Sequence, residues 1–329
     1  TQGGTNQQHD VAVAGGGEKA NFRISGGYDH STGTVIKQVL DRFTTRVALD
    51  YFVSDRIKIQ TNFDLTYTKN QRNYHSDLIG MAQRKMPNLS IYEEDANGND
   101  TDVFYTMNPY ITAANGGYYA ASGKFTTGAG TSDYKLLKTQ YDLANPVAVA
   151  HLARNEQRNV NLTPEFILDY DVLGTQPDQH RLKYQGQIVF NISSDDTDKY
   201  YPGVLVPENW TNSSYNAADA SYNKSHSIST RHTLTFVPHF KNEAHQLQFM
   251  ARYQYNNGNS SNQSVAKRSL PTSSDITSPL TGGVLSNISS GAGEWKSQFF
   301  LFSLHYAIKE RYIFDATLRR DGSTKFGPD

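Results

Sequence analysis

The chain of 329 residues contains no cysteine, only two tryptophans and almost no excess of charge of either sign. Without cysteine, disulfide bonds and thiolate chemistry are excluded. Because 31 basic residues nearly balance 32 acidic ones, the sequence lacks the basic stripe that indicates a nucleic-acid-binding protein. It also lacks any run of about 18 apolar residues, so it predicts no transmembrane helix.

Catalytic and metal-binding motifs are absent from the sequence as well. The ten histidines are scattered and form no H-E-x-x-H spacing. The stretch 95–100 has the composition of a calcium loop, but its glycine is misplaced and no glutamate follows at the required position. An Asn-Gly turn inside a loop hairpin is the favoured interpretation. We therefore predict no catalytic residue, no cofactor, no metal site and no enzymatic activity.

What the sequence does contain is strict alternation of apolar and polar residues, most clearly from Arg42 to Tyr67. The two parities are Phe43, Val47, Leu49, Ile59, Phe63 and Leu65 against Arg46, Asp50, Lys58 and Asp64. Because the side chains of a strand point alternately to two faces, this pattern predicts a hairpin with an apolar and a polar face. Each arm is long enough to cross a bilayer when tilted, as in outer-membrane β-barrels.

Similar alternation elsewhere predicts about ten strands. Their connections are short near 17, 55, 176, 242 and 309 and longer near 35, 110, 210 and 275. The long polar loops are expected at about 69–155, with a candidate helix at 76–85, and at about 193–226 and 256–294. Short turns at one end and long loops at the other are typical of outer-membrane barrels. The predicted fold is all-β: an antiparallel meander of about ten long strands, part of a large transmembrane β-barrel with long extracellular loops.

Two sets of side chains are candidates for contact with a solute. Loop aromatic residues can stack on sugar rings or on a partner, with plain loop packing as the alternative: Tyr118, Tyr119, Tyr200, Tyr201, Trp210 and Trp295. The second set is expected to face the lumen: Arg46, Asp50, Asp64, Glu165, Asp169, Arg231, Arg252 and Arg319. For this second set, a wetted lumen wall is favoured over a solute-binding site.

Several stretches resemble the SusC/RagA family of TonB-dependent outer-membrane transporters of Bacteroidota. They are G-G-G-E-K-A-N-F-R-I-S-G-G-Y (15–28), R-F-T-T-R-V-A-L-D-Y (42–51), K-M-P-N-L-S-I-Y-E (85–93), N-P-V-A-V-A (145–150) and R-Y-I-F-D-A-T-L-R-R-D-G-S-T-K-F-G-P (311–328). The resemblance runs from about residue 9 to the end, and its last motif is the most specific.

The resemblance implies a multi-pass protein of the bacterial outer membrane with a barrel of about 22 strands. It further implies a plug domain with a TonB box, a SusD-like lipoprotein as a lid, and import of glycans or peptides powered through the TonB complex. The chain starts at Thr1 without a signal peptide, so we interpret residues 1–329 as part of the barrel domain, without the plug and the C-terminal strands. A passive porin and a barrel-displayed adhesin or lectin are the alternative functions.

Two structural expectations follow. A partial barrel predicts a curved open sheet, with no ladder between residues 9–15 and 311–321. The connection 69–155 is expected to pack over the barrel mouth and to face the lid protein and the cargo; the alternative is that it only folds on neighbouring loops.

Overall fold

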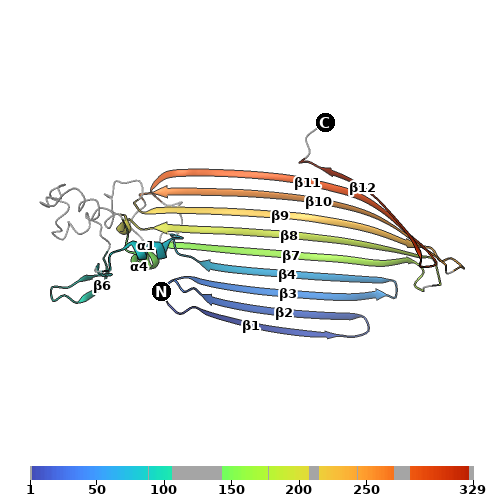
Figure 1. Cartoon of the computed structure of the whole chain (residues 1–329), viewed down its shortest axis with the longest axis horizontal. Helices are drawn as coiled ribbons and strands as arrows, with labels where there is room; N and C mark the ends of the chain where they lie inside the picture. The colour runs from blue at the N-terminus through green and yellow to red at the C-terminus, as the bar shows by residue number, and fades with distance from the viewer. Residues whose placement is uncertain are drawn as a thin grey trace.

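In the computed structural model, residues 2–87, 89–105, 143–176, 178–206, 215–242, 244–269 and 282–325 are described. Ten long strands form one antiparallel sheet in which neighbours follow chain order (Figure 1). The strands are β1 (Thr5–Gly16), β2 (Ala20–Thr32), β3 (Val39–Ser54), β4 (Ile57–Gln71), β7 (Arg154–Leu173), β8 (Arg181–Tyr201), β9 (Ala217–Val237), β10 (His245–Arg268), β11 (Val284–Ile308) and β12 (Tyr312–Ser323). The predicted meander is confirmed.

The strand register carries the sequence alternation across the whole sheet. Directly paired residues lie on the same face of an antiparallel ladder. Phe43 pairs with Tyr67, and Val47 pairs with Phe63, whereas Arg46 pairs with Asp64 on the other face. The same two parities continue through the registers from β2 to β12. The sheet therefore has an apolar face and a polar face, as predicted.

The apolar face forms a band whose height matches a membrane. On β4 the band runs from Ile57 to Tyr67, which is about 33 Å along a strand and about 25 Å of height at the usual barrel tilt. Phe43 and Phe63 remain 47% and 38% exposed, so protein does not cover this face. Within the described residues, no helix is long and apolar enough to cross a membrane.

The sheet extends well beyond this band at the end with the long connections, and here two predictions were wrong. In the regions 193–226 and 256–294, which were expected to be loops, the described residues are largely strand. Alternation disappears from their sequence because both faces are polar there, while the backbone ladder continues. Tyr200, Tyr201 and Trp295 are therefore strand residues rather than loop residues.

The remaining topology agrees with the sequence. The short turns lie at one end of the sheet and the long connections at the other (Figure 1). β1 and β12 are the two edges, and within the described residues no ladder joins them. The predicted open sheet is confirmed.

Parts of three long connections pack together at one end of the sheet. The predicted helix 76–85 is observed as α1 (Leu78–Arg84), which lies near α4 (Pro146–Leu152) and the short 3-10 helix η1 (Gly203–Leu205). Their buried residues form what we call the loop-end cluster: Leu78, Ala144, Ala148, Val149, Ala150 and Leu205. Val35 and Ile36 of the β2–β3 connection pack against it. The described part of 69–155 thus folds on neighbouring loops.

The stretch 95–100 is the tip of a small hairpin made of β5 (Tyr92–Glu94) and β6 (Asp100–Phe104). The Asp95 carboxylate accepts hydrogen bonds of 2.8 Å from the backbone N–H groups of Asn97 and Asn99. Gly98 has a φ of 82°, a conformation that favours glycine. The interpretation as a turn is confirmed.

Candidate functional site

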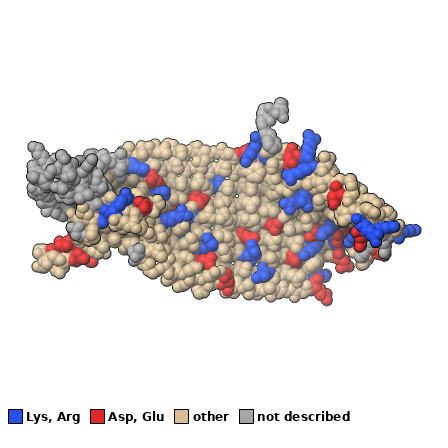
Figure 2. Space-filling model, viewed as in Figure 1, with Lys and Arg blue, Asp and Glu red and all other residues tan. Residues whose placement is uncertain are grey.

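The eight side chains predicted to face the lumen all lie on the polar face of the sheet. Asp50 contacts Lys58 at 3.0 Å, and Arg231 donates a 3.0 Å hydrogen bond to Gln254. Further pairs are Arg46–Asp64, Glu165–Asn62, Asp169–Lys183, Arg252–Thr233 and Arg319–Asp321. Figure 2 shows basic and acidic side chains interspersed over this face. Because these groups largely satisfy one another, the arrangement is that of a wetted wall.

A hollow of about 470 Å³ lies on the polar face beyond the apolar band, and we call it the upper pocket. The pocket is lined by residues from the five strands β7 to β11 and by Arg72, which directly follows β4. The lining includes Gln157, Lys199, Asp219, Ser264 and Asn287. Sequence reasoning missed this pocket because it assigned most of these residues to loops. The pocket residues of β7 and β8 alternate along their strands, and this alternation places them on one face. It could have indicated the pocket, but only after the pairing register of β7 and β8 was known.

The upper pocket has an excess of basic groups. The Asp219 carboxylate forms an ion pair of 2.8 Å with Arg268. Lys199 is the register partner of Asp219, yet neither Lys199 nor Arg72 forms an ion pair within the described residues. The Arg72 guanidinium lies 2.9 Å from the side-chain amide of Asn70, whose oxygen accepts from it when the amide is turned so that its oxygen faces Arg72. Two cations on the pocket wall therefore retain the capacity to bind an anion.

An aromatic group lies next to the upper pocket. The rings of Tyr74 and Tyr201 are 4.8 Å apart, and His75 lies 5.5 Å from Tyr201. Burial raises the pKa of Tyr201 to about 12. Burial and the nearby Asp219 carboxylate also raise the pKa of Tyr74, which places this ring near the pocket wall. Both phenols stay neutral at physiological pH.

The predicted aromatic candidates are distributed over different environments. Tyr200 is buried, and its hydroxyl donates a 3.3 Å hydrogen bond to the Asn216 side chain, so its role is structural. Tyr201 belongs to the aromatic group beside the upper pocket. Trp295 lies on the polar face of β11, where its ring fills the space beside Gly258. Tyr118, Tyr119 and Trp210 lie outside the described residues.

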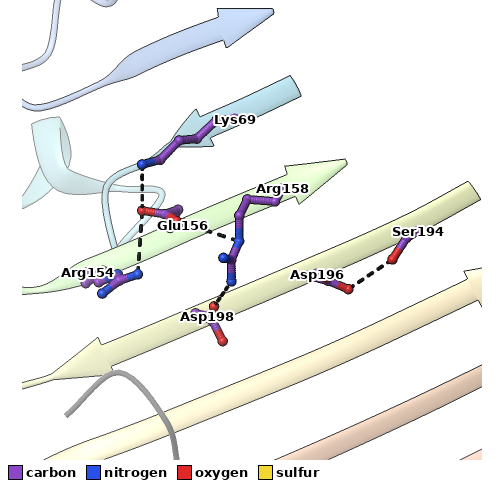
Figure 3. A network of polar contacts seen from close by, with 7 residues as sticks. All are labelled: Lys69, Arg154, Glu156, Arg158, Ser194, Asp196 and Asp198. Atoms are coloured by element: carbon purple, nitrogen blue, oxygen red, sulfur yellow. Dashed lines mark hydrogen bonds and ion pairs between the residues drawn. The ribbon is translucent and has the colours of Figure 1, made fainter. Parts of the chain in front are cut away.

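On the opposite face of the same wall lies an ion-pair network (Figure 3). Glu156 is its centre: its carboxylate lies 3.5 Å from both Lys69 Nζ and Arg154 Nη2 and 3.7 Å from Arg158 Nε. Arg158 also pairs with Asp198 on β8. The Glu156 side chain is only 14% exposed. The network joins the ends of β4, β7 and β8 directly behind the upper pocket.

Comparison with known proteins gave consistent matches, although no family model matches the chain. The chain is 23% identical over 326 residues to TonB-dependent receptor P3 of Formosa agariphila, covering 96% of this chain and 28% of the relative. It is 23% identical over 334 residues to TonB-dependent receptor SusC of Bacteroides thetaiotaomicron, covering 98% of this chain and 29% of the relative.

A solved structure of the RagAB peptide transporter has the same fold over nearly the whole chain. The TM-score is 0.63 at 15% identity, and the match covers 98% of this chain and 32% of that chain. The chain thus spans less than a third of the length of each of these three proteins.

Proposed function

We propose that the full-length protein is an active importer. The reason is that this chain is an outer-membrane β-barrel segment of the SusC/RagA type of TonB-dependent receptor. Residues 1–329 form part of its barrel domain. The cargo is a glycan or peptide too large for general porins. A SusD-like lipoprotein covers the outer opening, and the TonB complex supplies the energy.

One observation carries this proposal: a single sheet has an apolar band on one face and a paired, charged wall on the other. The apolar face has the height expected for the lipid-facing side of an outer-membrane barrel. The polar face gives a wetted lumen to which either a plug domain or a polar solute can bind. Relatives named as TonB-dependent receptors favour an energised importer over a passive porin or an adhesin.

The loop-end cluster supports the proposed place of the lid. It holds α1, α4 and the base of the β5–β6 hairpin at the end of the sheet that faces the cell exterior in an outer-membrane barrel. Asn145 accepts hydrogen bonds from the backbone N–H groups of Val147 and Ala148 and donates to the carbonyl oxygens of Ile91 and Tyr105. The described parts of the connections at this end thus pack and hydrogen-bond against each other, which gives a lid protein a defined surface to bind.

The test measures uptake by cells that express the full-length protein. A fluorescent oligosaccharide or peptide above the size limit of porins should accumulate in the periplasm, and accumulation should stop when TonB is deleted. Unchanged accumulation without TonB would favour a passive porin, and surface binding without accumulation would favour an adhesin. Either result would overturn the proposal.

The lid is tested separately by shortening the β5–β6 hairpin at its tip, residues 94–100, to a two-residue turn. This change keeps Asn145 and its two carbonyl partners in place. Capture of the lid protein should weaken while assembly of the barrel stays normal. Unchanged capture by a properly inserted variant would show that the tip of this hairpin is not part of the lid surface.

A further inference from the structure

We propose that the upper pocket is a subsite for the anionic group of an acidic oligosaccharide, such as the carboxylate of a uronic acid. This inference rests on the proposed import function and specifies one substrate class for it. It concerns a position on the barrel wall beyond the membrane, where an arriving solute is still hydrated.

The charges of the pocket indicate an anion. Arg72 and Lys199 lie on its wall, and within the described residues neither has an acidic partner. Asp219, the acidic residue among those lining the pocket, is already paired with Arg268, and the neighbouring Asp195 carboxylate accepts a 2.7 Å hydrogen bond from the Gln157 amide. Elsewhere on the polar face, Arg46 and Lys58 have carboxylate partners, whereas Arg231 and Arg252 donate to the uncharged side chains of Gln254 and Thr233. Arg72 and Lys199, which share one hollow, give the pocket wall a local positive potential, and such a potential attracts carboxylate or sulfate groups.

The uncharged lining is suited to hydroxyl groups. Amide side chains come from Asn155, Gln157 and Asn287, and hydroxyls come from three further residues, Thr197, Ser221 and Ser264. Such groups both donate and accept hydrogen bonds, as a sugar ring does with its several hydroxyls. The neutral rings of Tyr74 and Tyr201 pack against each other next to this lining, and Tyr201 also packs against the loop-end cluster.

An oligosaccharide fits this lining better than a peptide. Peptides are often bound as an added strand, which needs an unpaired strand edge. At the upper pocket, β8, β9 and β10 each pair with a neighbouring strand on both sides. The backbone of the residues that line the pocket is therefore already hydrogen-bonded and offers no free strand edge. Recognition must therefore come from side chains alone, and the polar ones are amides, hydroxyls, two cations and the Asp219 carboxylate, which is paired with Arg268.

The wall behind the pocket is braced. Asn155 and Gln157 of the pocket flank Glu156, the centre of the ion-pair network on the opposite face. Thr197 and Lys199 likewise flank Asp198, which pairs with Arg158. Alternation along each strand thus places a rigid charged brace directly behind the residues that would bind the ligand, which reduces the entropy lost on binding.

The experiment measures equilibrium binding to the purified full-length receptor at low salt. The probes are hexa-galacturonate, neutral maltohexaose and the acidic peptide hexa-glutamate. The test variant is the double substitution Arg72→Gln and Lys199→Gln. A matched control is Lys224→Gln, because Lys224 lies on the opposite face of β9 and forms no ion pair within the described residues. Losing two charge-assisted contacts should weaken hexa-galacturonate binding about tenfold.

Binding of hexa-galacturonate should be unchanged in the control, and the wild-type receptor should prefer it to both other probes. Equal binding by the double variant and the wild type would overturn the subsite. A preference for hexa-glutamate would overturn the choice of an oligosaccharide. TonB-dependent uptake is measured separately, so failure of the subsite leaves the proposed import function standing, and failure of import leaves the binding result standing.

Discussion

The same strands pass through two regions that differ in what their outward side chains contact. Within the apolar band, outward residues such as Tyr67 are apolar and 38% exposed. Two residues further along β4, Lys69 has the same parity and belongs to the ion-pair network. The backbone ladder is continuous through both regions. The polarity of the outward side chains therefore depends on whether they face lipid or water, while the backbone hydrogen bonds between the strands are the same in both regions.

The largest expected effect is that of a charge placed in the band. Val47 lies at the middle of the apolar run on β3, so Val47→Arg should destabilise the inserted barrel by about 2–4 kcal/mol, and Leu49→Arg by less. The measurement is the free energy of unfolding of the full-length protein in lipid bilayers. Ala48→Arg, on the polar face, is the control and should cost much less. Equal costs at Val47 and Ala48 would contradict the assignment of the faces.

A smaller effect is expected from the brace beyond the band. Glu156→Gln removes the centre of a partly buried network and should destabilise the ends of β7 and β8 by about 1–2 kcal/mol. Hydrogen exchange of the backbone amides of 154–159 and 194–201 measures this change. The control is Glu294→Gln, which breaks a single exposed pair with Lys296 and should cost less than about 1 kcal/mol. A network effect no larger than the control would show that the brace does not stabilise the wall.

The smallest effect is a pH dependence confined to the loop-end region. Burial lowers the pKa of Lys85 to about 8, well below the 10.5 of a lysine in water. Between these two values the unfolded region binds more protons than the folded one, so its stability should rise with pH from about 8 to about 9.5. Tyr201, whose pKa is raised, acts in the opposite direction only above about 10. Exchange protection of α1, corrected for intrinsic rates, should therefore increase across this window.

The control for the pH effect is Lys85→Gln, which removes the titrating group and should abolish the increase. An unchanged pH dependence in this variant would assign the effect to another group. The apolar band should show no such dependence in either protein, which separates the loop-end region from the membrane region.

How far the sequence predicts the structure differs between the two regions. From Arg42 to Tyr67 the membrane makes one face apolar and the lumen makes the other polar, so alternation alone identified the strands, their faces and their turn. From Ser193 to Tyr201 both faces contact water or polar groups, and the run S-S-D-D-T-D-K-Y-Y shows no alternation. Those residues were assigned to a loop because the signal depends on two different environments.

By itself, the sequence determined an antiparallel meander with two chemically distinct faces and with short and long connections at opposite ends. Only the tertiary structure decided how far the strands extend and which polar residues meet. Arg72, Lys199 and Asn287 are far apart in the sequence and come together because the registers of successive ladders align them. Hydropathy records the medium on each side of a strand, but the register depends on pairing between strands, which no single stretch of sequence contains.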